Sequence, residues 1–197
     1  MEVELNGARI HYRRSGAGYP VVFLHAGVAD SRMWEPQAAG LGKHFDVITP
    51  DMRGYGESEL PATSWSPTAD VLALMDALHI REAPHLVGCS IGGGIAIDFA
   101  LEHPERVSKL VLVGAGVADH QAADANDPIY AETISAEEAN DLGALNEAEM
   151  NLWLVGPGRT VSHVDQKLRD LFLDMNGIAL RSDFKSCLLY TSPSPRD

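Results

Sequence analysis

A serine flanked by glycines is the part of this sequence whose residue types and spacing could do chemistry. Residues 88–92 read Gly-Cys-Ser-Ile-Gly and follow an apolar run that ends at Val87. A glycine two positions to either side of a serine, where a strand changes to a helix, predicts a sharp turn that holds the serine in a strained conformation with its hydroxyl exposed. The first turn of that helix would point unpaired backbone N–H groups at the hydroxyl. Ser90 is therefore a candidate nucleophile.

The surroundings of Ser90 carry this interpretation, because the five-residue pattern alone occurs in many unrelated loops. Residues 84–87 predict a short buried strand, and Ile91, Ile95 and Phe99 recur at helical spacing after it. The opposite face of this predicted helix carries small residues: Gly92, Gly93, Ala96 and Ala100. Such a helix can lie close against a sheet, so the strand, the sharp turn and the helix are all indicated.

Length, composition and charge limit what the chain can be. With 197 residues, 45% of them hydrophobic, it can bury one sizeable core, which predicts one main domain. A formal net charge of −13 disfavours nucleic acids and anionic membranes as partners. No apolar run approaches the roughly 20 residues that span a bilayer, and the first residues form a strand pattern where a signal peptide would be basic and then apolar. We therefore expect a cytoplasmic protein.

Cysteine, histidine and glycine usage indicates neither a metal nor a cofactor. The two cysteines, Cys89 and Cys187, imply no disulfide framework, and we interpret Cys89 as a small packing residue beside the serine. The eight histidines are scattered and lack the paired spacing of a zinc site. The glycines at residues 92–94 lack the pattern of a phosphate-binding loop. We expect no metal and no cofactor.

Strand-like and helix-like segments alternate along the first part of the chain, which predicts a mostly parallel sheet covered by helices. The expected strands are a leading hairpin of residues 3–5 and 10–12, turned at Asn6-Gly7, followed by residues 21–24, 47–48, 84–87 and 107–113. One expected helix covers residues 32–41. Another begins at Ser66-Pro67, which offer a cap and a first-turn proline.

The composition changes after Gly116. Residues 119–158 contain nine acidic residues and no lysine or arginine. Helix starts at Ser135 and Asn146 would each suit a capping box. Either a solvated helical face or an acidic binding surface would explain this charge. A helical insertion packed over the mouth of the sheet would bury the segment's apolar residues, which are Leu142, Leu145, Met150, Trp153 and Leu154.

Three motifs, in this order along the chain, resemble the α/β-hydrolase superfamily. They are His-Ala-Gly at residues 25–27, Asp-Met-Arg-Gly-Tyr-Gly-Glu-Ser at residues 51–58, and Gly-Cys-Ser-Ile-Gly-Gly at residues 88–93. Within that superfamily, residues 32–37 and 103–107 are similar to the branch of 3-oxoadipate enol-lactonases and small carboxylesterases. The similarity extends from about residue 3 to residue 118.

The resemblance implies an α/β-hydrolase fold whose last strands are missing. It divides the chain into a core (residues 1–118) and a helical cap-like segment (residues 119–186). The implied activity is cofactor-independent hydrolysis of a small carboxylic ester or lactone through an acyl-enzyme, with 3-oxoadipate enol-lactone as the most specific candidate.

The resemblance also implies roles for single residues. Ser90 matches the nucleophile, and the backbone N–H groups of Gly27 and Ile91 match the two donors of an oxyanion hole. His25 matches a residue that braces the loop of Gly27 by hydrogen bonding. Ala26 departs from the glycine that is more usual after this histidine.

Other residues of the resemblance are expected to be structural or incomplete. Asp51 and Arg53 would tie down the turn at residues 54–56. In the family, an Asp or Glu and then a His follow the serine on loops after later strands, and together they activate it. The chain is expected to end before those strands. Four residues after Ser90 fall in the cap-like segment, where we do not expect them to complete a triad: Asp119, His120, His163 and Asp165.

The last eleven residues suggest why later strands would be missing. Residues 187–197 resemble an in-frame translation of a transposon-end adapter used in sequencing libraries, so we treat them as a non-native tail. The natural gene is then expected to continue beyond Ser186. In that case the 197-residue chain should hydrolyse esters near background, and its strand at residues 107–113 should present an unpaired apolar edge.

Several functional classes remain open. Carbon–carbon bond hydrolases and cofactor-free perhydrolases share the same serine turn, so the motif does not separate them from esterases. Dehalogenases and epoxide hydrolases carry a carboxylate in place of Ser90 and are disfavoured. A non-catalytic small-molecule receptor of the same fold and a purely structural or interaction module are the alternatives to an enzyme.

Overall fold

The computed structural model describes residues 1–60, 64–116 and 128–182. Within them, one six-stranded sheet has the order β1-β2-β4-β3-β5-β6. The strands are β1 (Glu2–Leu5), β2 (Ala8–Gly16), β3 (Tyr19–Leu24), β4 (Phe45–Pro50), β5 (His85–Cys89) and β6 (Lys109–Val113). β4, β3, β5 and β6 run parallel, whereas β1 and β2 are antiparallel to their neighbours. This mostly parallel sheet with flanking helices confirms the predicted fold class.

The leading hairpin forms at the predicted turn. β1 pairs with β2 so that Leu5 lies opposite Ala8, with only Asn6 and Gly7 between them. Both turn residues have positive φ angles, 47° for Asn6 and 77° for Gly7. A two-residue turn with this geometry matches the right-handed twist of the strands, and Asn-Gly is the pair that adopts it most readily.

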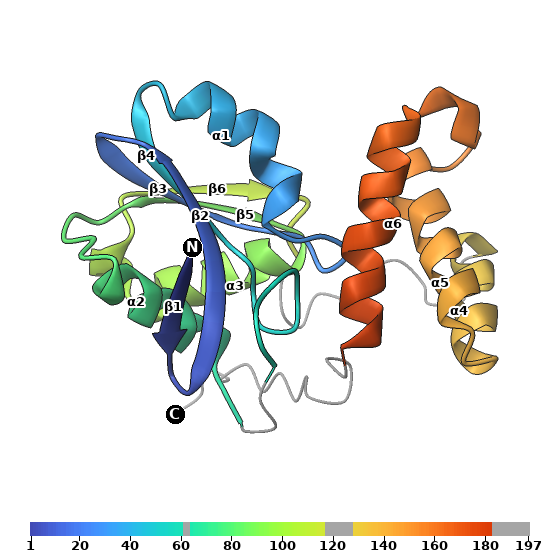
Figure 1. Cartoon of the computed structure of the whole chain (residues 1–197), viewed down its shortest axis with the longest axis horizontal. Coiled ribbons are helices and arrows are strands. Elements are labelled where there is room, and N and C mark those ends of the chain that lie inside the picture. Colours follow the sequence, from blue (N-terminus) through green and yellow to red (C-terminus); the bar gives the residue numbers. More distant parts are fainter. Residues whose placement is uncertain (61–63, 117–127, 183–197) are drawn as a thin grey trace.

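Helices cover both faces of the sheet. They are α1 (Glu35–Leu41), α2 (Pro67–Ala77) and α3 (Ile91–Glu102). Figure 1 shows α1 on one face and α2 and α3 on the other. The helix predicted for residues 32–41 begins with a 3-10 turn, Ser31–Trp34, because the side chain of Asp30 caps that turn by accepting the N–H of Arg32.

The residues of β3 alternate between the two layers. Val21 and Phe23 pack with Trp34 on the α1 side. Val22 and Leu24 belong to the larger core that the sheet forms with α2 and α3. A central strand that is buried on both faces reads as a continuous apolar run, which is why the sequence revealed it.

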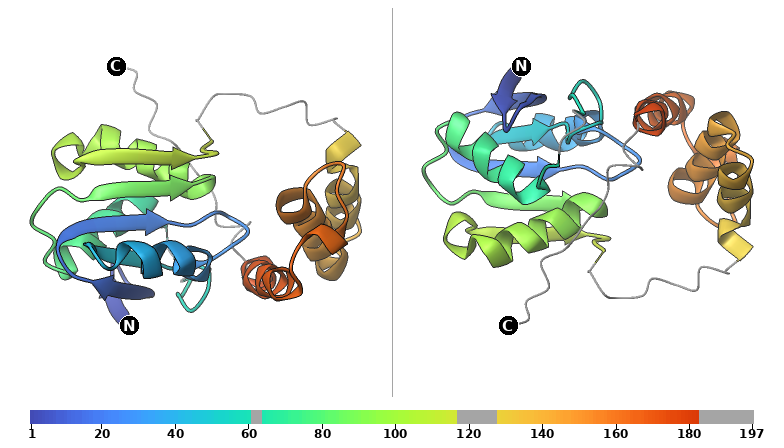
Figure 2. Two further views of the ribbon diagram at one scale, coloured as in Figure 1. Left: turned by 90° about the horizontal axis from the view of Figure 1, so that it is seen from above. Right: turned by 90° about the horizontal axis from the view of Figure 1, so that it is seen from below.

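The helical segment, defined here as residues 128–182, lies beyond one end of the sheet (Figures 1 and 2). A 3-10 turn (Pro128–Tyr130) leads into α4 (Ala131–Glu138), which is followed by α5 (Leu142–Glu149), a π-helical turn (Met150–Val155), a 3-10 turn (Val161–His163) and α6 (Gln166–Arg181). α6 is the helix of this segment nearest the sheet in every view.

The predicted helix starts in this segment are wrong. Ser135 lies inside α4 and Asn146 lies inside α5. α5 begins instead after Asp141, whose carboxylate accepts hydrogen bonds from the N–H groups of Gly143 and Ala144. A capping-box pattern inside a helix is not used, because the backbone N–H groups there already bond to the preceding turn.

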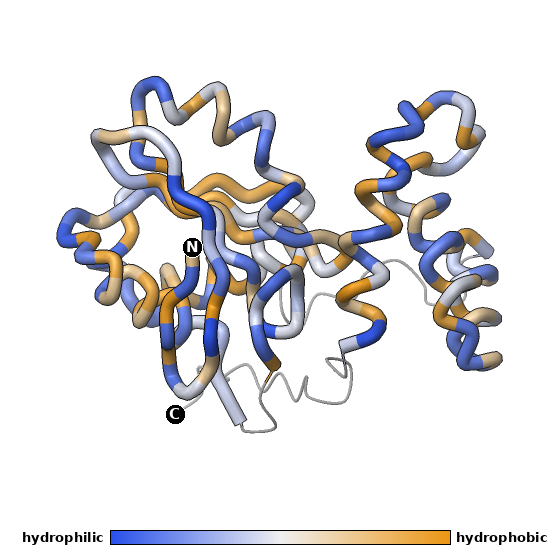
Figure 3. The backbone as a smooth tube through the Cα atoms, in the orientation of Figure 1, coloured by the Kyte–Doolittle hydropathy of each residue, from blue (hydrophilic) through white to orange (hydrophobic). Residues whose placement is uncertain are grey.

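Burial of the apolar residues in the helical segment differs from the expectation. Leu145 and Met150 are buried, but Leu142 and Trp153 remain 43% and 57% exposed. Along α4–α6, Figure 3 shows hydrophobic and hydrophilic residues alternating, as in helices with one buried side, whereas the central strands are mostly hydrophobic. In the described parts of the chain, no helix has the length and apolar character to cross a bilayer.

β6 forms an apolar edge of the described sheet, as the sequence led us to expect. Among the described strands it pairs with β5 alone, and all five of its residues are exposed. The strand begins at Lys109 and not at Val107, because the N–H of Val107 still bonds to the carbonyl of Pro104 and closes the preceding 3-10 turn. Unpaired N–H and C=O groups beside exposed valines and leucines can template pairing with another chain.

We expect the substitution Val111→Lys to raise the soluble fraction of the purified chain and to reduce large species in light scattering. Val111 lies at the middle of β6 and is 49% exposed, so a lysine there would place charge on the edge that invites pairing. Leu101→Lys, on the outer side of α3 at a 75% exposed position, is the matched control with the same change in charge. Equal improvement by both variants would contradict edge pairing as the cause.

Candidate active site

Ser90 occupies a strained turn between β5 and α3. Its φ and ψ angles are 52° and −117°, in a region that residues with a side chain rarely adopt. The N–H of Ser90 donates to the carbonyl of Val113 on β6 (3.0 Å), and its carbonyl accepts the N–H of Gly93 (2.9 Å). The side chain is exposed and does not cap α3. The hydroxyl is thus presented at the carboxyl end of the parallel strands.

The glycines around Ser90 are required by close backbone contacts. A Cβ atom on Gly88 would lie 2.3 Å from the carbonyl oxygen of Gly92. A Cβ atom on Gly92 would lie 2.5 Å from the carbonyl oxygens of both Leu24 and His25. The spacing of glycine, serine and glycine therefore reflects α3 lying directly against the ends of β5 and β3.

Gly27 lies in a tight turn after β3, beside Ile91. The turn spans residues 26–29, and the N–H of Ala29 closes it by donating to the carbonyl of Ala26 (3.1 Å). A Cβ atom on Gly27 would lie 3.4 Å from Cγ2 of Ile91 and 3.6 Å from Oη of Tyr55. The structure therefore brings Gly27 and Ile91 together, with Ile91 the residue after Ser90.

His25 is a fully buried brace of this turn. Its Nδ1 donates to the carbonyl of Ala26 (2.8 Å), and its Nε2 accepts the N–H of Met52 (2.9 Å). Burial lowers the pKa of His25 even though the Ala26 carbonyl and Asp51 favour the charged ring, so the ring is neutral near pH 7. Because both ring nitrogens are occupied, His25 is not placed to take a proton from Ser90.

The side chain of Asp51 forms hydrogen bonds with three separate segments of the chain. Its carboxylate accepts the N–H of Ser31 (2.8 Å), the N–H of Glu57 (3.0 Å) and Nδ1 of His11 (2.9 Å). Burial acts to raise the pKa of Asp51, but the hydrogen bonds from Ser31 and Glu57 outweigh it and hold the pKa below its usual value. This carboxylate lies against the turn at residues 54–56, because a Cβ atom on Gly56 would lie 2.2 Å from Oδ2 of Asp51 and the N–H of Glu57, directly after the turn, bonds to it.

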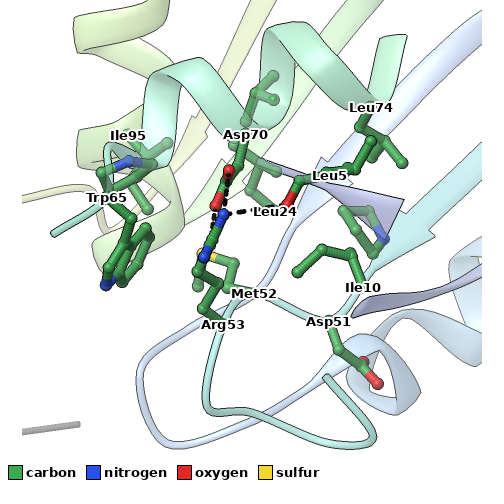
Figure 4. Close-up of a pocket in the computed structure, with 13 residues that line it drawn as sticks. Leu5, Ile10, Leu24, Asp51, Met52, Arg53, Trp65, Asp70, Leu74 and Ile95 are labelled. Atoms are coloured by element: carbon green, nitrogen blue, oxygen red, sulfur yellow. Dashed lines mark hydrogen bonds and ion pairs between the residues drawn. The ribbon is translucent and has the colours of Figure 1, made fainter. Parts of the chain in front are cut away.

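Arg53 has a different structural role from the one predicted. Its guanidinium pairs with Asp70 at the start of α2 (Nη2–Oδ1 2.9 Å) and donates to the carbonyl of Leu5 in the hairpin (3.2 Å). The pair lies beside a mostly apolar cavity of about 30 Å³, lined by Trp65 among others (Figure 4). Arg53 therefore joins α2 to the hairpin and makes no hydrogen bond to the turn at residues 54–56 in the described structure.

The candidates that follow Ser90 have structural tasks where they are described. Nδ1 of His163 accepts the N–H of Thr160 (3.1 Å), and Asp165 caps α6 by accepting the N–H of Lys167 (2.9 Å). Asp119 and His120 lie outside the described residues. Over residues 1–60, 64–116 and 128–182, no hydrogen bond joins the Ser90 hydroxyl to a histidine or a carboxylate, and no group of three or more acidic, Cys or His side chains could hold a metal.

Cys89 packs beside Ser90 in the apolar surroundings of the turn. Burial raises the pKa of its thiol, which keeps the thiol protonated near neutral pH. Its side chain contacts the apolar cluster around Ala26 and Ala29. The structure therefore describes Cys89 as a packing residue.

Sequence reasoning missed the contact between α6 and the turn at residues 26–29. Met175 of α6 is buried in one cluster with Ala26 and Ala29. The available signal was the apolar spacing along α6, where hydrophobic residues recur three and four positions apart: Leu168, Leu171, Phe172 and Met175. That spacing predicts a buried helix face but not which segment covers it.

Comparison with protein families identifies the fold. The model of the alpha/beta hydrolase fold family matches residues 19–176 of the chain. The chain belongs to the alpha/beta hydrolase fold family. The matched residues include the parallel strands β3 to β6 and the turn that carries Ser90.

Individual relatives of this alpha/beta hydrolase differ in what they act on. The chain is 36% identical over 160 residues to a 2-hydroxymuconate semialdehyde hydrolase of Pseudomonas sp. (strain CF600), and the match covers 77% of the chain and 56% of that relative. It is 37% identical over 123 residues to a 2-hydroxy-6-oxo-6-phenylhexa-2,4-dienoate hydrolase of Comamonas testosteroni, covering 58% of the chain and 43% of that relative. The chain thus spans about half the length of the curated relatives it matches.

Solved structures with the same architecture include lactonases and esterases. The enol-lactonase from Burkholderia xenovorans LB400 superposes with a TM-score of 0.71 at 27% identity, covering 95% of this chain and 73% of that one. An esterase from Rhodococcus sp. ECU1013 superposes with a TM-score of 0.72 at 25% identity, covering 92% and 70%. The chain therefore has structural neighbours in the branch of the family that its sequence motifs resemble.

We expect Gly92→Ala to destabilise the protein by about 1–3 kcal/mol, because its Cβ atom would overlap backbone carbonyls 2.5 Å away that are not free to move. Gly94→Ala is the matched control in the same helix, where the nearest atom is the carbonyl oxygen of Gly116 at 3.3 Å. It should be neutral or stabilise by up to about 1 kcal/mol through helix propensity. Urea unfolding of both variants tests this, and equal effects would contradict the close-contact explanation.

We expect the free energy of unfolding to fall as the pH is lowered from 7.5 to 5.5. Burial lowers the pKa of His25 in the folded protein, whereas the unfolded chain binds a proton on this residue below about pH 6.5. The unfolded state then binds more protons, so stability decreases with a slope of up to about 1.4 kcal/mol per pH unit from this residue.

Urea unfolding at several pH values, compared between the unmodified protein and His25→Asn, measures that contribution. Asn retains a donor for the Ala26 carbonyl but does not titrate in this range. The variant should be less stable at pH 7.5 and should show a shallower pH dependence. Identical slopes for the two proteins would mean that His25 does not carry the effect.

Proposed function

We propose that this alpha/beta hydrolase cleaves a small carboxylic ester or lactone, with Ser90 as the nucleophile. The observation that carries the proposal is the exposed, strained Ser90 next to two residues, Gly27 and Ile91, whose backbone N–H groups have no acceptor among the described residues. Because the chain spans only part of its relatives, the activity is proposed for the whole protein.

The chemistry follows from these groups. The Ser90 oxygen attacks the substrate carbonyl carbon while its proton passes to a base, and the carbonyl oxygen becomes a negatively charged tetrahedral centre. The N–H groups of Gly27 and Ile91 would stabilise that oxygen, each by about 3 kcal/mol in the transition state. The alcohol then leaves with the proton, and water hydrolyses the acyl-serine. We assign the base to a histidine outside the described residues, since His25 has both nitrogens occupied.

The choice among substrates rests on different comparisons. The structural neighbours that include an enol-lactonase support a lactone or ester, and 3-oxoadipate enol-lactone is the most specific candidate. The 36% identical 2-hydroxymuconate semialdehyde hydrolase favours a second candidate, hydrolysis of a carbon–carbon bond in a substrate of that kind. Both reactions pass through an oxyanion beside Ser90. We further propose that residues 119–186 act as a cap over the site.

Turnover by an extended chain tests this proposal. A protein in which residues 1–186 are followed by the C-terminal sequence from source DNA should hydrolyse a p-nitrophenyl ester or an enol-lactone, whereas the 197-residue chain should act near background. Ser90→Ala in the extended protein should lower kcat/KM at least about 1,000-fold. Loss of 2-hydroxymuconate semialdehyde absorbance, measured in parallel, separates the two candidate substrates.

Ser108→Ala is the control, because Ser108 is an exposed serine outside the site and should leave turnover unchanged. Undiminished hydrolysis by Ser90→Ala would show that another group is the nucleophile. Binding of these substrates without turnover, by an extended protein that has an Asp and a His after Ser90, would also contradict the proposal.

A further inference from the structure

The turn at residues 26–29 reaches out from the end of β3 and is contacted by α6. Met175, 4% exposed, lies in one buried cluster with Ala26 and Ala29, the first and last residues of the turn. Val28, Met33, Cys89 and Leu171 pack around this cluster. Figure 1 shows the segment after β3 extending to the middle of α6. One helix of the helical segment therefore contacts the part of the sheet that carries Gly27.

The side chain of Ala26 contributes a methyl group to the contact between α6 and the turn. A glycine is more usual after the histidine in the sequence pattern that the chain resembles, and here an alanine stands at that position. Its methyl group is one of the surfaces in the cluster with Met175. The N–H of Ala26 also contacts the sulfur of Met33 (3.4 Å), so the residue is held from inside the core as well.

A charged contact lies next to the apolar one. Arg32 pairs with Asp30, which directly follows the turn (Nη2–Oδ2 2.7 Å), and with Asp174, which directly precedes Met175 (Nη1–Oδ2 2.6 Å). Asp30 is buried, whereas Asp174 is 58% exposed. Because exposed ion pairs contribute little to stability, the Arg32–Asp174 pair orients α6 more than it stabilises it.

We infer that Met175 is a positioning residue: by packing on Ala26 and Ala29, it lets α6 hold the 26–29 turn so that the N–H of Gly27 faces the same space as that of Ile91. The catalytic meaning of this contact rests on the proposed function, because Gly27 is proposed there as an oxyanion donor. The contact itself does not. The helical segment would then set the geometry of the site as well as cover it.

Residue-resolved NMR of the 197-residue chain tests the inference without any turnover. The N–H of Ala29 closes the turn by its bond to the Ala26 carbonyl, so its hydrogen exchange reports opening of the turn. Met175→Ala should accelerate that exchange at least tenfold and shift the amide resonance of Gly27. Met175→Leu, which restores most of the volume, should return both towards their original values.

Phe172→Ala is the matched control, since Phe172 is buried on the same helix but lies outside the cluster around the turn. It should lower the free energy of unfolding, because it also removes a buried side chain of α6, without accelerating exchange at Ala29. Unchanged exchange at Ala29 in Met175→Ala, or equal acceleration in Phe172→Ala, would overturn the inference. A failure here leaves hydrolysis by Ser90 untouched, and inactivity of Ser90 leaves these exchange rates untouched.

If α6 does not fold in Met175→Ala, removal of the opposite surface provides the second test. Ala26→Gly deletes a methyl group from the buried cluster that contains Met175, and exchange at Ala29 should again accelerate. Unchanged exchange at Ala29 in Ala26→Gly would overturn the inference.

Discussion

The close approach of α3 to the ends of β3 and β5 is the constraint on which the rest of this structure depends. It exists because Gly88 and Gly92 have no side chain: a Cβ atom at either position would lie only 2.3–2.5 Å from backbone carbonyl oxygens. With the helix this close, Ser90 must adopt a positive φ, and its side chain is exposed at the end of the sheet. Any larger residue at either glycine would push α3 outward and release the strain that presents the serine.

Buried hydrogen bonds hold the turn at residues 26–29, which carries Gly27 and lies beside the residue after Ser90. His25 bonds to the Ala26 carbonyl and to the N–H of Met52, and Asp51 joins the segments of His11, Ser31 and Glu57. These bonds link the ends of strands to loops from elsewhere in the chain, so the turn that carries Gly27 is held from its core side. Such fixed geometry is what stabilisation of an oxyanion needs, because donors that are already oriented do not have to reorganise during the reaction.

Two surfaces of the described fold differ in how completely they are covered. The 26–29 turn is packed from the core by Met33 and from α6 by Met175. β6, by contrast, anchors Ser90 through the Val113 carbonyl yet exposes its side chains and one edge. The curated relatives are about twice as long as the regions that match this chain. In the described sheet, β6, which accepts the N–H of Ser90, is an edge strand.

The sequence alone determined the features that depend on neighbours along the chain. The Asn6-Gly7 hairpin, the Ser66 cap and the strand, turn and helix around Ser90 follow from local backbone sterics and apolar spacing. Only the tertiary structure decided that Arg53 pairs with Asp70, that Trp153 stays exposed and that Met175 reaches the turn of Gly27. Such contacts join separate segments of the chain, so periodicity predicts that a face is buried but not what covers it. Partner choice is set by packing of the whole chain.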